Sequence, residues 1–331
     1  MNNATRNETL AARNEAALFD LSNRGKLKVV GRERAEWLHG MVSNDVVGLK
    51  PGQGNYGTVL TDRGKALADY RLLVCGDSLR FDTEPGIEKA VSERLNRFII
   101  SEDAEIVDET AEWQIWGVAG PRSKEILEKA FGEEAPPVSL YGSFCVGDGF
   151  AARQNRTGEH GYDVWLRPSE AEEAVRRMEE AGAKRIGAEA LETLRIEAGI
   201  ARYGVDFDEN IIPLEAQLGH AIHWEKGCYV GQEIIARMHY RGHPNKLLVS
   251  LRFGEGPAPS AGIDLFREAA DSKRSGWITS AAYSPSLDAW VGLGYVRAKM
   301  AEIGTEYAIR LADGGFQAAV VSEAPYASGS E

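Results

Sequence analysis

The chain has 331 residues, of which 43% are hydrophobic and 27% are charged, a composition typical of a globular protein with a large core. Its net charge of −12 opposes nucleic acid and anionic membranes, so we expect no direct nucleic-acid partner and no membrane partner. We find neither a secretory signal nor a run of about eighteen apolar residues. The sparse, odd set of Cys75, Cys145 and Cys228 indicates reduced thiols and predicts a cytoplasmic location.

Short elements separated by turn residues are predicted for the first part of the chain. Residues 1–20 are expected to form a polar-faced helix or a mobile arm, and PGQGNYG (51–57) is expected to be a turn. GQGNYG matches the dinucleotide string G-x-G-x-x-G, but strand residues follow it instead of a helix, which argues against a nucleotide site. The expected strands are 26–30, 58–62, 69–76, 78–84 and 113–118, with helices over 32–45 and 87–100.

Helices and a strand pair are predicted for the middle of the chain, and strands alone for its end. Pro121 and Gly132 bracket one helix, and two more are expected over 169–183 and 188–199, after a strand pair within 150–166. Beyond Pro244 the chain consists of short strands separated by Gly, Pro, Asp and Ser. This pattern of short strands and turn residues predicts a small all-β barrel or sandwich, with a domain boundary near residue 245.

The stretch KGCYVGQEIIAR (226–237) places a thiol in a tight loop ahead of a helix. Gly227 and Gly231 permit the loop, and helix formers follow from Gln232. A helix N-terminus and the cation of Lys226 would favour the thiolate of Cys228, suited to a nucleophile, a redox centre or a soft-metal ligand. The alternative is a small buried hydrophobe, which free cysteine often is.

Other polar residues near this stretch have more ordinary interpretations. Glu233 and Arg237 are four residues apart, which predicts an ion pair on the helix. Histidines gather around Cys228, but without a paired C-x-x-C or an acidic second shell, so we predict no metal site. The histidines in question are His220, His223, His239 and His243.

Two acidic positions lie beside aromatic residues in predicted strands. In RTGEHGYDVWL (156–166), Tyr162, Val164 and Leu166 point to one side, while Asp163 and Trp165 point to the other. A carboxylate beside an indole suits a flat, hydrogen-bonding heterocycle, and a solvated strand face is the alternative. In TDRGKALADYRLL (61–73), Asp69 precedes Tyr70, where a surface ion pair is the default expectation.

Taken together, these segments resemble the folate-binding family that joins the glycine-cleavage T-protein, an aminomethyltransferase, to the YgfZ-type proteins. The resemblance includes VSNDVVGLKPGQGNYGTVLTDRGKALADY, RTGEHGYDVWL, LRIEAGIARYGVDFDENIIPLEA and GWITSAAYSPSL. KGCYVGQEIIAR looks like the signature of the YgfZ branch, since T-proteins usually have an aspartate at the position of Cys228.

The resemblance implies an α+β fold of three modules, two α+β modules around a central hole and a C-terminal antiparallel β-barrel. The expected modules are 1–50 with 140–244, an insert over 51–139, the barrel over 245–322 and a frayed tail over 323–331. Tetrahydrofolate or a one-carbon derivative is the implied cofactor, bound in the hole. We also expect a monomer.

The resemblance also assigns site residues by position. Asp163 matches the acidic residue that T-proteins use for the pterin ring, and Leu191 falls where T-proteins tend to have an arginine. Asp69 matches one of two aspartates near the folate amine, but the other is replaced by Ala68. The remaining residues expected at the cofactor are the aromatic residues Tyr70, Tyr162 and Trp165.

Three functions follow from these assignments. The first expectation is a folate-binding accessory protein that supports iron–sulfur cluster assembly or repair and, indirectly, tRNA modification. Its functional thiol would be Cys228, with Lys226 stabilising the thiolate and Tyr229 and Gln232 shaping the loop. The alternative is a folate-dependent one-carbon transferase of the T-protein kind that uses Asp69, with aminomethyl transfer disfavoured by the missing aspartate. The third is a protein that only binds folate, so enzymatic activity stays open.

Overall fold

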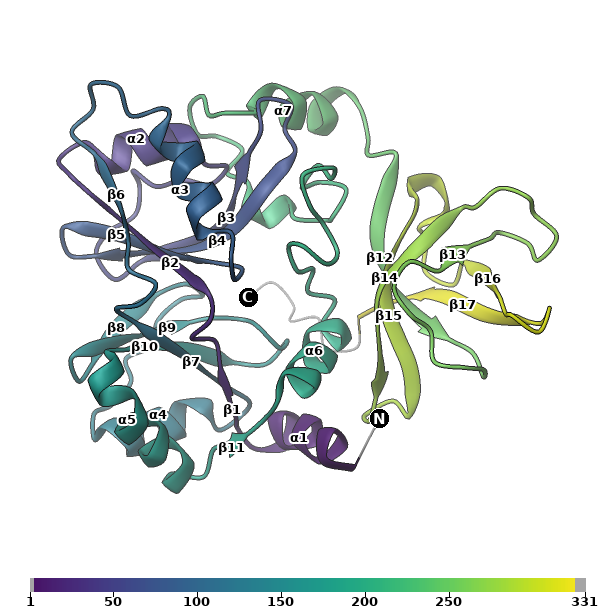
Figure 1. Ribbon diagram of the computed structural model, residues 1–331, viewed down its shortest axis with the longest axis horizontal. Helices are drawn as coiled ribbons and strands as arrows, with labels where there is room; N and C mark the ends of the chain where they lie inside the picture. Colours follow the sequence, from purple (N-terminus) through teal and green to yellow (C-terminus); the bar gives the residue numbers. More distant parts are fainter. Residues whose placement is uncertain (1–2, 325–331) are drawn as a thin grey trace.

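The computed structural model describes residues 3–324, which form three sheets with separate cores (Figure 1). The first sheet has six strands in the order β11-β1-β7-β10-β9-β8. Helices α4 and α5 cover one face of this sheet, while α1 and α6 pack near the other. The bounds are α1 Asn3–Asn14, β1 Ala17–Asp20, β7 Gln114–Ala119, α4 Ser123–Phe131, β8 Ser143–Val146, β9 Gly149–Arg153, β10 Gly161–Leu166, α5 Pro168–Glu180, β11 Lys184–Arg185 and α6 Ala188–Glu197.

Strand β10 illustrates how alternation builds both cores of the first sheet. Val164 and Leu166 pack in the cluster that includes Met178 of α5, while Trp165 packs in the opposite cluster with Leu194 of α6. Successive strand residues point to opposite faces, so a strand buried on both sides reads as a continuous apolar run. The predicted alternation in this segment is confirmed.

The second sheet has five strands in the order β3-β4-β5-β2-β6 and lies above the first in Figure 1. Helices α2 and α3 contribute apolar residues to its core, with Trp37 and Leu95 among them. Its other face turns toward the middle of the molecule and carries polar residues. The bounds are β2 Gly25–Val30, α2 Arg34–Met41, β3 Gly54–Leu60, β4 Ala66–Cys75, β5 Ser78–Thr83, α3 Glu88–Asn96 and β6 Glu105–Asp108.

The third sheet is a nearly closed antiparallel barrel in the order β13-β14-β15-β12-β17-β16. An isolated bridge between Phe266 and Ala308 joins the region after β13 to β16 and brings the two edges together. The bounds are β12 Lys246–Phe253, β13 Asp264–Leu265, β14 Gly276–Ser284, β15 Ala289–Arg297, η2 Ala298–Met300, β16 Glu306–Arg310 and β17 Phe316–Ser322. In the sequence, the segment between the two modules and the barrel contains η1 Gly219–Ala221 and α7 Gln232–Arg241.

The expected fold class is confirmed, with several local differences. Strands β1, β6 and β8 are absent from the prediction, because they are four-residue segments with few consecutive strand formers. Strand β3 begins at Gly54, so only the first part of the predicted turn is a turn. The sheets divide the chain near residues 25 and 108, whereas the prediction places an insert over 51–139. Most of the tail predicted to be frayed lies outside the described residues. Within residues 3–324, no helix combines the length and apolar character needed to cross a bilayer.

Candidate functional site

Two neighbouring cavities lie between the two α+β modules and the segment after α6. We call the first the charged cavity; it has a volume of about 450 Å³ and is lined by Arg24, Asp69, Arg71, Glu84, Arg156, Leu191 and Arg202, among others. The second, the aromatic cavity, has a volume of about 690 Å³ and is lined by Tyr56, Tyr141, His160 and His220, among others. The two share Arg71, Ile200 and Ala201 as walls, so they meet in the middle of the molecule.

Strand β4 places a carboxylate and a guanidinium in this space. Asp69 and Arg71 are two residues apart on β4, so their side chains leave the same face of the sheet. Tyr56 lies directly opposite Arg71 on β3, and its hydroxyl donates to Asp69 Oδ2 at 3.0 Å. Asp69 is 2% exposed, and burial raises the pKa of its carboxyl against the opposing charge of Arg71.

The aromatic cavity has a stacked group of rings beside this pair. The ring of Tyr56 stacks on His220 with centroids 5.4 Å apart and on Tyr141 with centroids 6.4 Å apart. Burial lowers the pKa of His220, and the charge of Arg71 lowers it further. The wall therefore offers flat, mostly neutral ring faces next to one acid and one base.

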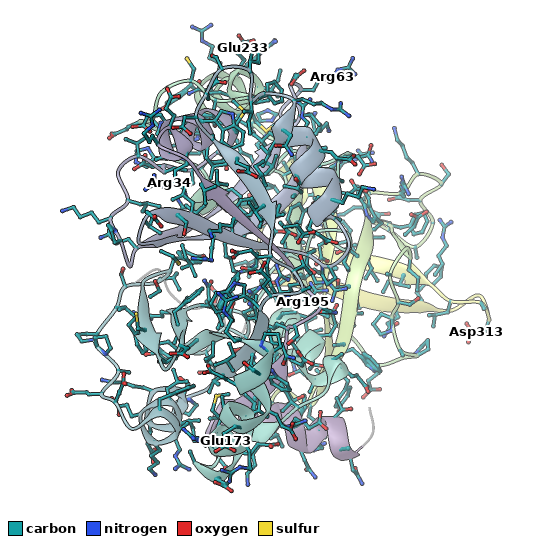
Figure 2. The ribbon with its side chains drawn as sticks, turned by 60° about the vertical axis from the view of Figure 1, so that its left-hand side comes forward. Arg34, Arg63, Glu173, Arg195, Glu233 and Asp313 are labelled. Atoms are coloured by element: carbon teal, nitrogen blue, oxygen red, sulfur yellow. The ribbon has the colours of Figure 1, made fainter. Side chains whose placement is uncertain are left out.

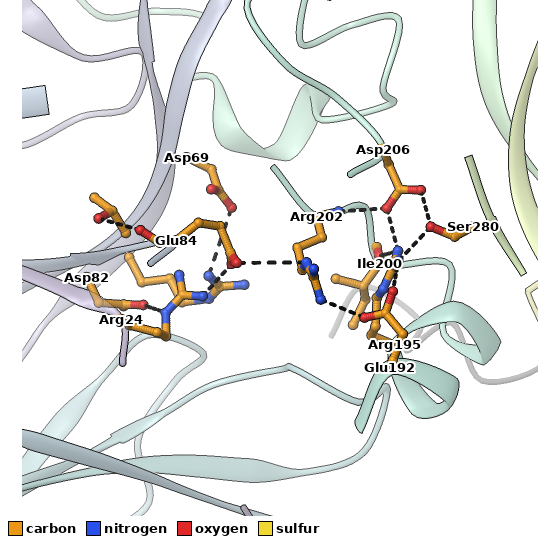
Figure 3. A network of polar contacts seen from close by, with 12 residues as sticks. Arg24, Asp69, Asp82, Glu84, Glu192, Arg195, Ile200, Arg202, Asp206 and Ser280 are labelled. Carbon is orange, nitrogen blue, oxygen red and sulfur yellow. Dashed lines mark hydrogen bonds and ion pairs between the residues drawn. The ribbon is translucent and has the colours of Figure 1, made fainter. Parts of the chain in front are cut away.

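Most of the other charged groups of the charged cavity already have ionic partners (Figure 3). Arg24 donates to Asp82 and to Glu84. Arg156 also donates to Asp82, at 2.9 Å. Burial opposes ionisation of Asp82, but these arginines hold its pKa below the ordinary value. These contacts form an ionic network beside the cavity, contributed by β5 and by residues just outside β2, β5 and β10.

A second network faces the first from α6 and the barrel (Figure 3). Arg195 of α6 donates to Asp206, to Glu192 and to Ser280 of β14. Arg202 donates to Glu192 at 2.8 Å and lies 3.9 Å from Glu84 on the opposite wall, atom to atom. These contacts tie the barrel to the modules and fix the position of the α6 wall.

The structure pairs Asp163, the residue predicted to hold the pterin, with an arginine. The residue is 1% exposed, and both of its carboxylate oxygens accept from Arg156 Nε, at 3.2 and 3.0 Å. Arg156 lines the charged cavity, while Asp163 is not among its lining residues. The acid predicted to hold a pterin is therefore engaged by an arginine that stands in the cavity wall.

The aromatic residues predicted at the cofactor belong to the cores instead. Tyr70 points away from Asp69 into the core of the second sheet, where it meets Phe81 edge-on. Tyr162 and Trp165 lie in the two cores of the first sheet. Alternation explains the position of Tyr70, which lies between the cavity-lining residues Asp69 and Arg71 on β4. Leu191 does line the charged cavity, as an apolar contact.

The loop that contains Cys228 is ordered by Lys226. The Lys226 ammonium donates to the backbone carbonyls of His39, Val42 and Asn44 at 2.6, 2.7 and 2.7 Å. Burial lowers the pKa of Lys226 to about 7, while the three carbonyls favour the charged form. An ammonium has three N–H donors, so none remains for the exposed thiol of Cys228. The predicted pairing of Lys226 with the thiolate is therefore not observed.

Other loop residues have structural tasks. Tyr229 is buried against Ile235 of α7, and Gln232 Nε2 donates to the carbonyl of Gly227 at 3.4 Å, as expected of residues that shape the loop. Gly231 has a φ of +82°, and a Cβ there would lie 2.5 Å from the carbonyl oxygen of Thr61, so only glycine fits without strain.

The ion pair predicted on α7 does not form within the described residues. Glu233 and Arg237 share no salt bridge, and Glu233 lies at the outer edge of the molecule (Figure 2). Exposed ion pairs contribute little to stability, so a spacing of four residues on a helix is a weak predictor that the pair forms.

Sequence reasoning missed the charged lining of the cavity. Arg24, Arg71, Arg156 and Arg202 are scattered over 179 positions of the chain and form no motif. One signal was available for Arg71, because its position two residues after Asp69 in a predicted strand places both side chains on one face.

Comparison with known proteins assigns the family. Residues 1–226 match the GCVT N-terminal domain, and residues 246–327 match the glycine cleavage T-protein C-terminal barrel domain. The chain belongs to the glycine cleavage T-protein family. It is 32% identical to the aminomethyltransferase of Rubrobacter xylanophilus over 86% of this chain and 77% of that protein. It is also 32% identical to the aminomethyltransferase of Halothermothrix orenii over 91% of this chain and 86% of that protein.

A solved structure supports the same assignment. The glycine cleavage system aminomethyltransferase T from Bartonella henselae superimposes with a TM-score of 0.89 at 26% identity, over 97% of this chain and 89% of that chain. These relatives overturn the first functional expectation. They bear the name aminomethyltransferase, and none of them supports the YgfZ branch or a role in iron–sulfur assembly and tRNA modification. The T-protein alternative is the better supported of the two.

Proposed function

We propose that this protein is a tetrahydrofolate-dependent one-carbon transferase of the aminomethyltransferase kind, and that its chemistry takes place between the two cavities. One observation carries the proposal: Asp69 Oδ1 is a buried carboxylate oxygen in the cavity wall that has no hydrogen-bond partner in the described part of the chain. Such an oxygen accepts an N–H and exchanges a proton with an amine. The name of the relatives supports the same chemistry.

The cavity residues fit tetrahydrofolate in size and in character. The volumes of about 450 and 690 Å³ lie in the range of small-molecule sites. The rings of Tyr56, Tyr141 and His220 provide stacking faces, and Leu191 provides an apolar contact. Asp69 would accept an N–H of the folate. When bound, tetrahydrofolate supplies the amine that accepts the one-carbon unit.

The fit does not use Asp163 as the family resemblance implies. Both oxygens of this carboxylate accept from Arg156, and Asp163 is not among the residues that line the charged cavity. The Arg156 guanidinium, held between Asp82 and Asp163, presents the polar surface there instead. We therefore expect the heterocycle to be recognised by different contacts from those of T-proteins.

The surroundings of Asp69 suit a proton-transfer role. Burial raises the pKa of its carboxyl, which brings protonation closer to neutral pH and so favours exchange with an amine. The Tyr56 hydroxyl holds Oδ2 and leaves Oδ1 for the substrate. Because the carboxylate is 2% exposed, water competes weakly for this oxygen.

The test compares Asp69→Asn with the exposed hairpin variant Asp77→Asn. Anaerobic calorimetry with tetrahydrofolate and tetrahydrofolate-dependent release of ammonia from an aminomethyl thioether are measured for both. We expect saturable binding by the wild type and a kcat about 10²–10⁴ times lower for Asp69→Asn, as for the loss of a general acid–base group. Asp77→Asn should match the wild type. Absence of tetrahydrofolate binding by folded wild-type protein, or full activity of Asp69→Asn, would refute the proposal.

A further inference from the structure

Asp69 and Arg71 each keep one buried polar atom without a hydrogen-bond partner among residues 3–324. These atoms are Asp69 Oδ1 and Arg71 Nη1, and the residues are only 2% and 8% exposed. Nη1 lies 4.0 Å from Asp69 Oδ2, which is beyond hydrogen-bond distance. A buried polar group without a hydrogen bond destabilises the fold, more so when it is charged, so both atoms can accept an external partner.

The pair is held in a fixed position. Both residues belong to β4, in the interior of the second sheet, and both line the charged cavity. The Tyr56 hydroxyl fixes the carboxylate, and the Tyr56 ring lies 5.2 Å from the guanidinium carbon of Arg71. The ring of His220 stacks on that of Tyr56. One negative and one positive group therefore face the cavity a few ångströms apart.

Neighbouring charges do not compete for the two free atoms. Arg24 is engaged by Asp82 and Glu84 through two of its nitrogens, although its Nη2 is also unpaired. Arg156 is engaged by Asp82 and Asp163. Among the described residues of this wall, Asp69 is thus an anionic side chain and Arg71 a cationic side chain with a hydrogen-bonding atom available to a ligand.

We propose that Asp69 and Arg71 form a recognition site for a small zwitterion, an amine that also carries a carboxylate, as in an α-amino acid. Its ammonium would donate to Asp69 Oδ1, and its carboxylate would accept from Arg71 Nη1. Charge-assisted hydrogen bonds of this kind are stronger than neutral ones, and an amino acid headgroup carries both of the opposite charges that the two residues would bind. The inference rests on the proposed function for the place of the amine, and it adds that Arg71 selects amines by their carboxylate.

The experiment titrates the full chain with N-methylglycine and with glycine, without folate. Methylamine and acetate serve as half-ligands, each of which offers one of the two charges. We expect both amino acids to bind at least tenfold more tightly than either half-ligand. Arg71→Gln should reduce the affinity for N-methylglycine tenfold or more and leave the affinity for methylamine unchanged. Arg71→Lys, which keeps the charge, should recover part of the affinity.

Two outcomes would overturn the proposal. Binding of methylamine as tightly as N-methylglycine by the wild type would mean that the carboxylate is not recognised, and this comparison needs no variant to fold. No binding of N-methylglycine would mean that Asp69 and Arg71 only neutralise each other.

A further arm separates the amino acid from the glutamate of folate as the source of the carboxylate. Tetrahydrofolate is compared with tetrahydropteroate, which lacks the glutamate. If Arg71→Gln weakens only tetrahydrofolate and leaves N-methylglycine unaffected, the guanidinium serves the folate glutamate and the proposal fails. Failure of tetrahydrofolate to bind at all would instead refute the proposed function, whatever the amino acid titration gives.

Discussion

Replacing Lys226 by methionine tests whether this residue builds the loop or activates the thiol. Its ammonium caps three carbonyls at the end of α2 and just beyond it, from His39 to Asn44. The carbonyls of His39 and Val42 belong to the C-terminal end of α2, where backbone acceptors lack partners within the helix and the helix dipole favours a cation. Lys226→Met keeps most of the aliphatic volume and removes all three hydrogen bonds.

The expected loss follows from these contacts. Hydrogen bonds to a charged group contribute about 1.5–3 kcal/mol each, but removing the buried ammonium also removes its desolvation cost. We therefore expect a net loss of about 2–4 kcal/mol, or a melting temperature lower by about 4–10 °C for a chain of this size. The exposed Lys50→Met, as a matched control, should melt within about 1 °C of the wild type.

Thermal denaturation followed by circular dichroism measures the loss, and alkylation of Cys228 by iodoacetamide supplies a second readout. If Lys226 stabilised the thiolate, its removal would slow alkylation and leave the melting temperature unchanged. If it holds the loop, its removal lowers the melting temperature and does not slow alkylation. A Lys226→Met variant as stable as Lys50→Met would refute the structural argument.

Three further predictions follow. Asp163→Ala should destabilise the protein by about 3 kcal/mol in urea denaturation, because Arg156 would lose one of its two buried acidic partners, and unchanged stability would contradict this. Asp82 has a lowered pKa in the folded state, so its stabilising contribution is complete above its ordinary value of 3.8 and is lost as the pH falls below it. Urea denaturation between pH 2 and 7 should show this loss, and Asp82→Asn should make the curve flatter. Cys228→Ser should change the free energy of unfolding by no more than about 0.5 kcal/mol and leave tetrahydrofolate affinity unchanged, because the thiol is exposed and lies outside the cavity lining. A lower affinity for tetrahydrofolate would show that the thiol takes part in the binding site.

Much of the fold could be predicted from local sequence. Helix α4 lies between Pro121 and Gly132, as these two residues predict. Gly132 has a φ of +71°, a left-handed conformation that ends the helix. The barrel begins at Lys246, one residue from the predicted boundary. Alternation along β10 assigned Val164 and Trp165 to opposite faces correctly. In each case the signal lies within a few residues of the structure it predicts, because backbone geometry sets the period.

The roles of charged residues were decided by the tertiary structure. Lys226 and Cys228 are two positions apart, yet the ammonium binds carbonyls 182 to 187 positions away. Asp163 carries the acid expected of the family, but its function depends on Arg156, which a turn folds back onto it. Charges act through space and over a few ångströms, so a motif fixes which groups exist and leaves open which of them meet.

By itself, the sequence determined the module types, the strand and helix periods and the family resemblance, because these depend on local spacing. Only the tertiary structure decided which carboxylate is free. Asp69 and Asp163 both lie in β-strands next to aromatic residues, and nothing in their local sequence separates them. Folding gives Asp163 three hydrogen bonds from Arg156. It leaves one oxygen of Asp69 and one nitrogen of Arg71 without a hydrogen bond from any described residue. Long-range pairing of buried charges, which no local pattern encodes, makes that difference.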